Sequence, residues 1–365
     1  MHILHVVGAR PNFMKVAPVM RALRASSVRQ TLVHTGQHYD AQMSDVFFKQ
    51  LDLAGPDVNL AVGSGTHGQQ TGEIMIRLEP VVVERKPDWV LVYGDVNSTA
   101  AAALVCAKLG VPVAHVEAGL RSYDRRMPEE INRVITDQIA DLLLTPSQDG
   151  NGNLLREGVA PSKIRMVGNV MIDTLIQLLP CAARYAPKKL PSQYALVTLH
   201  RPSNVDEPQM LRELISALQW LSEEIEVFFP VHPRTQRHLQ ELGFSGSGRC
   251  LRILGPMPYL EFLAMQMQAT VVITDSGGVQ EESTYLGVPC LTLRENTERP
   301  ITVELGTNVL VGADMCRLRV EVEKVLNGEF KRGQIPPLWD GHASERIAEI
   351  LISGITEAAD VGVAA

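Results

Sequence analysis

The sequence predicts an α/β protein made of two doubly wound, Rossmann-like domains. Short runs rich in Val, Ile and Leu alternate with longer segments whose apolar residues recur at helical spacing. This alternation is typical of a parallel sheet with helices on both faces. The same rhythm starts again near residue 195, and a chain of 365 residues is long enough for two domains that each have a core.

The first domain is expected to span residues 1–170 and to begin with a short buried strand. Its strands are expected at Ile3–Val7, Thr31–His34, Trp89–Tyr93, Val113–Val116 and Leu142–Leu144. The helices between them are expected to include Phe13–Arg24, Thr71–Arg85 and Ser98–Leu109.

The second domain is expected to span residues 171–342, after a connection within Gly168–Pro191. Its strands are expected at Ala195–Leu199, Val227–Phe229, Arg252–Leu254, Val271–Thr274 and Cys290–Leu293. Residues 343–365 are expected to form an amphipathic helix, Ala343–Ile355, and a frayed tail. A ligand is expected in the cleft between the two domains, at the carboxyl ends of the strands.

Composition and charge exclude several classes of protein. A formal net charge of −7 argues against a general nucleic-acid binder. The five cysteines are scattered, without a CxxC pair or a Cys/His cluster, so we expect no disulfide framework, no metal site and a cytoplasmic location. No apolar run approaches the roughly 18 residues of a membrane span, and the N-terminus lacks the pattern of a signal peptide.

The loop after the first strand, GARPNFMK, carries two cations at the start of a helix. Arg10 and Lys15 lie about one helical turn apart there. Because helix N-termini attract anions, these residues predict contact with an anionic group. An ordinary solvated loop would also fit them. No GxGxxG or GxxxxGK[ST] fingerprint follows, which argues against a dinucleotide site or a P-loop.

Acidic residues mark three loops or helix starts of the first domain. They are Asp95 in YGDVNST, Glu117 in HVEAGLRS and Glu129 in MPEEINR. Each alone could be a helix cap or a partner of a helix dipole. Together, at one edge of one sheet, they favour an acid–base cluster, because crowded carboxylates suit proton transfer near neutral pH.

Basic residues follow two strands of the second domain. His200 and Arg201 stand in HRPSN, and His232 stands in HPRT. A histidine at a strand end can transfer protons near neutral pH, and an arginine can bind phosphate or carboxylate. A purely structural role fits these residues equally well.

The segment TDSGGVQEES joins a strand to a helix. Ser276, Gly277 and Gly278 let backbone amides approach a ligand closely, which predicts a cradle for a diphosphate. Glu282 lies one turn further on and would be repelled by phosphate, so we expect it to face a hydroxylated group such as ribose. Arg299 in RENTERP is a further candidate anion contact, or a member of a surface ion pair.

The order and spacing of these motifs resemble one family. GARPNFMK, GDVNST, HVEAGLRS, MPEEINR, LHRPSN, HPRT, DSGGVQEE and TERP together resemble the non-hydrolysing UDP-N-acetylglucosamine (UDP-GlcNAc) 2-epimerases over roughly residues 3–355. The resemblance implies a glycosyltransferase-B-like arrangement of two Rossmann-like domains with the active site in the interdomain cleft. It also implies a C-terminal helix that crosses back to the first domain, a UDP-sugar substrate and a homodimer.

The resemblance further implies that UDP-GlcNAc and UDP-ManNAc are interconverted without a cofactor, which supplies ManNAc-type sugars for surface polysaccharide. In the family the C2 proton is removed, UDP is expelled to give 2-acetamidoglucal, and UDP then adds again. The positions that match its proton-transfer groups are Asp95, Glu117, Glu129 and His200. The positions that match its substrate-binding groups are Arg10, Lys15, His232, Ser276, Gly277, Gly278, Glu282 and Arg299, with Glu282 on the ribose.

Departures from the family pattern leave regulation and the exact sugar open. One bacterial branch has a second UDP-GlcNAc site used for activation, and Gln37, Glu129 and Arg201 match its contacts. An arginine expected near Gly63–His67 is absent. Residues 36–40 and 65–72 resemble relatives that epimerise UDP-2,3-diacetamido-glucuronic acid, whereas TERP and QEE favour the UDP-GlcNAc enzyme.

Three other classes of protein fit parts of the sequence. A glycosyltransferase of the same fold would place a carboxylate against ribose, but it would not need three acids in its first domain. A hydrolysing epimerase has different sequences around the equivalents of Glu117 and Arg299. A nucleotide-binding protein without catalysis would have no need of His200 or of the acids.

Overall fold

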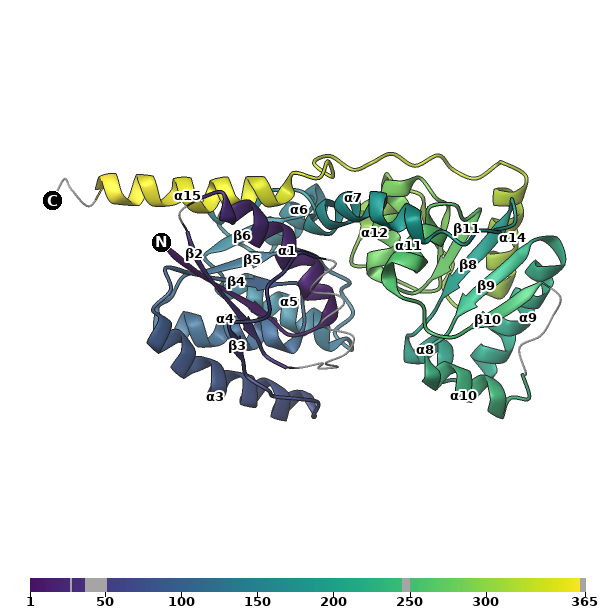
Figure 1. Cartoon of the computed structure of the whole chain (residues 1–365), viewed down its shortest axis with the longest axis horizontal. Coiled ribbons are helices and arrows are strands. Elements are labelled where there is room, and N and C mark those ends of the chain that lie inside the picture. Colours follow the sequence, from purple (N-terminus) through teal and green to yellow (C-terminus); the bar gives the residue numbers. More distant parts are fainter. Residues whose placement is uncertain (27, 37–50, 245–249, 362–365) are drawn as a thin grey trace. The chain divides into compact units, whose positions relative to one another are not determined.

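The computed structural model describes residues 1–26, 28–36, 51–244 and 250–361 (Figure 1). The chain folds into two compact units. Unit 1 comprises Met1–Thr174 and Pro337–Ala365, and unit 2 comprises Leu175–Pro336. Each unit contains a parallel sheet, so the predicted α/β class with two doubly wound units is confirmed.

The sheet of unit 1 has, within the described residues, seven parallel strands in the order β3-β2-β1-β4-β5-β6-β7. Its strands are β1 (His2–Val7), β2 (Arg29–His34), β3 (Val58–Asn59), β4 (Trp89–Tyr93), β5 (Val113–Val116), β6 (Leu142–Thr145) and β7 (Ile164–Met166). The central strands are buried on both faces, which explains their continuous apolar runs.

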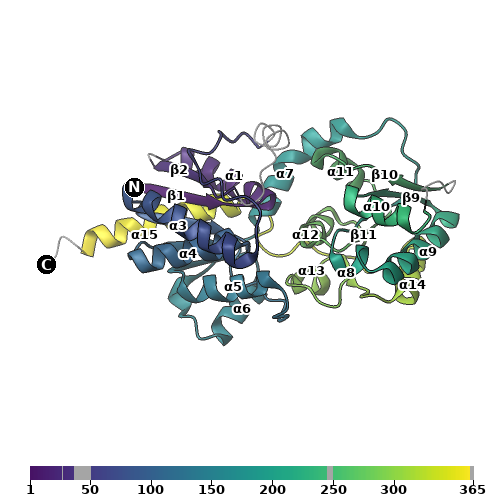
Figure 2. The ribbon, with the colours of Figure 1, turned by 90° about the horizontal axis from the view of Figure 1, so that it is seen from below.

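Helices cover both faces of this sheet (Figures 1 and 2). They are α1 (Arg10–Arg24), α3 (His67–Arg85), α4 (Asn97–Leu109), α5 (Pro128–Ile139), α6 (Gln148–Arg156), the 3-10 turn η1 (Pro161–Lys163) and α15 (Ala343–Val361). Leu78 and Val82 of α3 and Ala102 and Ala103 of α4 share one core with Leu4 and Val6 of β1. The C-terminal helix α15 packs against α1.

The sheet of unit 2 repeats this order with, in the part of the chain described, six parallel strands arranged β10-β9-β8-β11-β12-β13. Its strands are β8 (Tyr194–Thr198), β9 (Glu226–Pro230), β10 (Leu251–Leu254), β11 (Val271–Thr274), β12 (Cys290–Thr292) and β13 (Asn308–Leu310). Its helices are η2 (Ala183–Tyr185), α8 (Pro202–Val205), α9 (Pro208–Glu224), α10 (Pro233–Glu241), α11 (Tyr259–Gln266), α12 (Gly277–Leu286), α13 (Pro300–Glu304) and α14 (Met315–Leu326).

Two apolar clusters form the core of unit 2, one on each face of its sheet. Helices α9 and α14 contribute residues such as Leu218 and Leu318 to one cluster. Residues of α11 and α12, including Met265 and Val279, pack with Tyr194 on the other side. No helix of the described chain is long and apolar enough to cross a bilayer.

All ten strands expected from the sequence are present, with ends that differ by at most a few residues. Three further strands were missed: Val58–Asn59, Ile164–Met166 and Asn308–Leu310. Each is two or three residues long and lies at or near the end of its sheet, so it carries too little apolar pattern to be recognised from sequence. The helix expected at Ala343–Ile355 is present and longer than predicted.

The chain leaves unit 1 within α7 (Val170–Ala182) and returns at Pro337. The returning segment is fastened to unit 1 by polar contacts. Trp339 Nε1 donates to the Pro146 carbonyl at 3.0 Å, and Asp173 accepts from the backbone N–H groups of Ala343 (3.2 Å) and Ser344 (2.7 Å) at the start of α15. The last helix therefore belongs to unit 1 although its sequence follows unit 2.

We expect Gly168→Ala to destabilise this junction more than Gly158→Ala does. Both glycines have a left-handed φ, of +90° and +82°, so alanine costs about 1–2 kcal/mol at either position. A methyl group at Gly168 would also lie 2.1 Å from the Leu338 carbonyl oxygen, whereas Gly158 has open space. Urea unfolding should show an additional loss of about 2 kcal/mol at Gly168. Equal losses for the two variants would contradict this account of the junction.

Candidate active site

The order of strands reverses at one point in each sheet. In unit 1 the reversal lies between β1 and β4, and in unit 2 it lies between β8 and β11. At such a switch point the loops leave their strands in opposite directions and open a crevice at the carboxyl ends. The loops that follow these four strands carry Arg10, Asp95, His200 and Ser276.

Asn12 ties the two switch-point strands of unit 1 together. Its Oδ1 accepts hydrogen bonds from the backbone N–H groups of Gly8 (3.1 Å) and Ala9 (3.0 Å). Its Nδ2 donates to the carbonyl of Tyr93 at the end of β4, at 2.8 Å. The start of α1 is thereby fixed against β4, and Arg10 is the exposed first residue of that helix.

Lys15 and Glu117 form an ion pair in the interior of unit 1. Both side chains are almost completely buried, and a buried charge requires such a partner. Glu117 follows β5 directly and has φ +75°, a left-handed conformation that is uncommon for any residue except glycine. Strained backbone of this kind is concentrated at functional sites. From the sequence we expect Lys15 to contact an anionic group of the substrate; in the structure its ammonium pairs with the Glu117 carboxylate, and the contact with the substrate stays a prediction.

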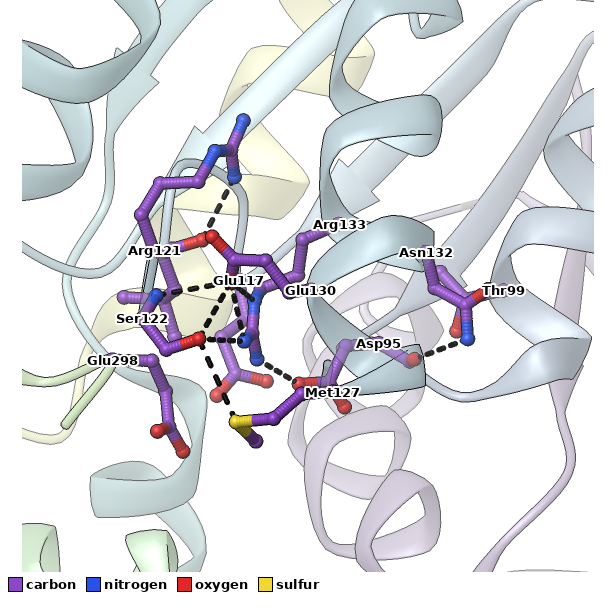
Figure 3. Close-up of polar contacts among 12 residues, drawn as sticks. Asp95, Thr99, Glu117, Arg121, Ser122, Met127, Glu130, Asn132, Arg133 and Glu298 are labelled. Carbon is purple, nitrogen blue, oxygen red and sulfur yellow. Dashed lines mark hydrogen bonds and ion pairs between the residues drawn. The ribbon is translucent and has the colours of Figure 1, made fainter. Parts of the chain in front are cut away.

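Asp95 belongs to a second, separate ion-pair network, which Figure 3 shows. Arg133 Nη1 donates to Asp95 Oδ2 at 2.5 Å. The same guanidinium donates to Glu130 Oε2 through Nε (3.0 Å) and Nη2 (2.6 Å). Arg133 is 2% exposed, whereas the Asp95 side chain is 29% exposed. Asp95 is therefore the member of the network that remains accessible to a ligand.

Glu130, the neighbour of the predicted Glu129, anchors this network. Its carboxylate accepts from the backbone N–H groups of Ser122 and Tyr123, both at 2.9 Å. Burial alone would raise the pKa of Glu130, but these hydrogen bonds and Arg133 hold it below its usual value. Glu129 is exposed on the same first turn of α5.

A buried His–Asp–Arg network lies beneath these loops. His115 donates from Nε2 to the Gly94 carbonyl at 2.8 Å, and its Nδ1 lies 2.6 Å from Asp137 Oδ1. Asp137 Oδ2 accepts from Arg121 at 2.7 Å and from the Gly119 N–H at 3.1 Å. Burial would raise the pKa of Asp137, but His115 and Arg121 bring it below its usual value. The network connects the loops that carry Asp95 and Glu117.

His200 pairs with Asp275 across the switch point of unit 2. Its Nδ1 lies 2.8 Å from Asp275 Oδ1, and the ring is 59% exposed while Asp275 is fully buried. Asp275 also accepts from the Arg201 N–H and from Asn204 Nδ2, both at 2.9 Å. Arg201 Nε also donates a hydrogen bond to the backbone carbonyl of Asp275, at 3.2 Å. The end of β8 is thus fastened to the end of β11.

The N-terminus of α12 adjoins a second guanidinium. Ser276 is the N-cap residue, and Gly277 and Gly278 form the first turn. A Cβ at Gly277 would lie 2.4 Å from Arg299 Nη1, so only glycine lets Arg299 approach this turn. Arg299 is paired with Glu298 and, at 2.8 Å, with Glu281. Arg299 is buried, so the alternative of a surface ion pair is wrong, and its role as an anion contact stays a prediction.

Glu282 is buried one turn into α12 and accepts a hydrogen bond from the Tyr259 hydroxyl at 2.8 Å. Burial raises the pKa of Glu282 to about 7; the Tyr259 bond opposes this rise and the neighbouring Glu281 adds to it. Such a carboxylate is close to half-charged at neutral pH, which suits a partner that can both donate and accept hydrogen bonds.

The remaining predicted residues lie outside these networks. His232 is the exposed N-cap of α10 and accepts from the Arg234 N–H at 3.3 Å, so a structural role accounts for its contact. Gln37 lies outside the described residues. Among the described residues, no three His, Cys, Asp or Glu side chains form a group that could hold a metal ion.

Four important side chains were not singled out from the sequence: Asn12, Glu130, Arg133 and Asp275. Asp275 stands at a strand end as Asp95 does, so the same rule could have found it. The i, i+3 spacing of Glu130 and Arg133 was a signal for an ion pair on one helix face. Asn12 gave no signal beyond an ordinary helix cap.

Two parallel-sheet units with polar switch points define an α/β protein of the glycosyltransferase-B-like class. The family model described as UDP-N-acetylglucosamine 2-epimerase matches residues 21–352. The chain belongs to the UDP-N-acetylglucosamine 2-epimerase family, and it is therefore an isomerase.

Curated relatives and solved structures agree with this assignment. A UDP-N-acetylglucosamine 2-epimerase from Methanocaldococcus jannaschii is 44% identical over 96% of this chain and 98% of its own. The crystal structure of the enzyme from that organism, in complex with UDP-GlcNAc and UDP, has a TM-score of 0.88 and covers 97% of this chain and 100% of its own. A Pseudomonas aeruginosa UDP-2,3-diacetamido-2,3-dideoxy-D-glucuronate 2-epimerase is 43% identical over 96% of this chain and 99% of its own.

The raised pKa of Glu282 predicts a pH-dependent stability. Native Glu282 keeps a proton to about pH 7, whereas the unfolded chain loses it near 4.5, so the free energy of unfolding falls as pH rises between these values. Glu282→Gln removes this contribution. As the pH rises from about 5 to about 8, the free energy of unfolding of the variant should increase relative to that of the wild type by on the order of 3 kcal/mol. Urea unfolding at both pH values measures it, and a constant difference would contradict the assignment.

Proposed function

We propose that this enzyme interconverts UDP-GlcNAc and UDP-ManNAc by inverting C2, and thereby supplies ManNAc-type sugars for surface polysaccharide. One observation carries the proposal. Two carboxylates, Asp95 and Glu117, follow adjacent strands β4 and β5, and each is held by its own cation, Arg133 or Lys15. Inversion at carbon needs two proton-transfer groups, since the proton leaves one face and arrives at the other.

In the proposed reaction the C2–H bond breaks as a base takes the proton, and the C1–O bond to UDP breaks with its electron pair leaving on UDP. The electrons of the C2–H bond form the C1–C2 double bond of 2-acetamidoglucal. UDP then adds to C1 again while C2 receives a proton on its other face. Arg133 donates a hydrogen bond to Oδ2 of Asp95, which leaves Oδ1 for the sugar. Glu129 is the third proposed proton-transfer acid.

Unit 2 binds UDP in this proposal. The first turn of α12 at Ser276, Gly277 and Gly278 offers backbone N–H groups and a positive dipole end to the diphosphate. Arg299 beside Gly277 supports this assignment, and Glu282 faces the ribose. His200 serves as a proton-transfer group near the departing diphosphate, with Arg10 and His232 as further anion contacts.

UDP-2,3-diacetamido-glucuronic acid is a second candidate substrate. The Pseudomonas relative named for this activity is 43% identical, nearly as similar as the relative named for UDP-GlcNAc. Both reactions invert C2 of a UDP-acetamido sugar, so the acids and the UDP site serve either one. We further propose a homodimer, on the family resemblance, and a cytoplasmic location, which the free cysteines support.

An NMR time course in D2O with UDP-GlcNAc, without acceptor or added cofactor, tests the reaction. We expect UDP-ManNAc deuterated at C2 with the sugar still attached to UDP. Free ManNAc with UDP would instead indicate hydrolysis. An unchanged UDP-GlcNAc spectrum, combined with turnover of the diacetamido-uronate, would establish the second substrate.

We expect Asp95→Asn and Glu117→Gln to lower kcat by about 100-fold or more, because each removes a proton-transfer group. UDP affinity, measured by titration calorimetry, should stay within about 2-fold, since neither residue belongs to the UDP site. Glu73→Gln, which breaks the exposed ion pair with Arg77 on α3, is the matched control and should keep wild-type turnover. Near-normal kcat in either acid variant would exclude that residue from proton transfer.

A further inference from the structure

The His200–Asp275 pair has a geometry that determines where the imidazole proton lies. Asp275 is fully buried, and its two oxygens face only donors: the N–H groups of His200 and Arg201, the amide of Asn204 and the ring of His200. These bonds hold the pKa of Asp275 below its usual value against the effect of burial. An ionised carboxylate can only accept, so His200 Nδ1 must donate.

This arrangement fixes the tautomer of the neutral ring. When Nδ1 carries the proton, Nε2 keeps its lone pair, because neutral imidazole has one N–H. The hydrogen bond made by one ring nitrogen decides the state of the other. The His200 side chain is 59% exposed, so the nitrogen that is not bonded to Asp275 belongs to the accessible part of the pair.

We propose that Asp275 is a positioning residue for the reaction, which fixes His200 as the Nδ1–H tautomer and leaves Nε2 as its proton-transfer atom. This inference rests on the proposed function for His200. Nε2 takes up the proton that leaves C2 during the elimination, and the imidazolium gives a proton back when UDP adds again. The imidazolium that forms in between is stabilised by the adjacent carboxylate.

A different role for Asp275 is to hold the loop after β8 through its bonds to the backbone of His200 and Arg201. The two roles make different predictions. If Asp275 has only a structural role, substituting it should lower activity whether or not the His200 ring is present. If it positions the ring, the substitution should lower activity only when the ring is present. Removal of the ring therefore separates them.

The direct test is two-bond 1H–15N NMR of the full chain labelled in its histidine rings, recorded at alkaline pH without substrate. His200→Gln identifies the His200 signals among the ten histidines. We expect a protonated Nδ1 and an unprotonated Nε2 in the wild type, and loss of this preference in Asp275→Asn. Asn204→Ala, which removes another donor from Asp275 Oδ2, is the matched control and should keep the wild-type tautomer. Protonated Nε2 in the wild type, or an unchanged tautomer in Asp275→Asn, would overturn the proposal.

Kinetics complete the test. Asp275→Asn should lower kcat by about 100-fold with UDP affinity unchanged, but it should cost less than about 3-fold when added to His200→Gln. An equal loss in both backgrounds would assign Asp275 a structural role only. Because the NMR experiment needs no substrate, it decides the tautomer even if the chain does not epimerise UDP-GlcNAc. Normal turnover of His200→Gln would reject the proposed function of His200 separately.

Discussion

The reversal of strand order in each sheet is the constraint on which the candidate residues of each unit depend. In a parallel sheet every strand ends at the same edge, but only at the reversal do the following helices diverge to opposite faces and leave that edge open. The backbone N–H and C=O groups just beyond the strand ends lie outside the hydrogen-bond ladder of the sheet, so they need other polar partners. Asn12 meets this need between β1 and β4, and Asp275 meets it between β8 and β11. In the proposed reaction, the side chains that stabilise the two edges also position the residues that carry out the chemistry.

Charge pairing follows from this placement. Lys15, Glu117, Glu130 and Arg133 are buried at this edge, and an unpaired charge there would be far more destabilising than an exposed one. Lys15 pairs with Glu117, and Arg133 is shared between Asp95 and Glu130. Glu130 is further stabilised by the backbone N–H groups of Ser122 and Tyr123. The left-handed backbone of Glu117 persists because Lys15 and the Leu144 carbonyl hold it from two sides. The surrounding contacts therefore maintain a conformation that the residue alone would avoid.

The sequence was sufficient for the fold because parallel strands between covered faces have long apolar runs, and the order of motifs identified the strand ends. Asp95, Glu117 and His200 could be predicted, since each directly follows such a run. The contacts of these residues could not. Arg133 lies 38 residues from Asp95, and Lys15 lies 102 residues from Glu117, so their pairing depends on strand order and not on spacing. The pair Glu129 and Glu130 shows the same limit: helix phase decides which acid is buried, and both fit the helix start equally well.

The distribution of charge between the units fits an elimination in which UDP leaves as an anion. The carboxylates at the edge of unit 1 would repel a diphosphate, whereas the start of α12 and Arg299 in unit 2 would stabilise it. Unit 2 has its own acids near that helix, but Glu281 pairs with Arg299, and Glu298 pairs with both Arg294 and Arg299. Glu282 has a pKa near 7 because of burial, so at neutral pH it adds only part of a negative charge. In the proposed reaction, unit 2 therefore has little uncompensated negative charge near the departing UDP. The Glu282 carboxyl still offers an oxygen that can form a hydrogen bond with the ribose.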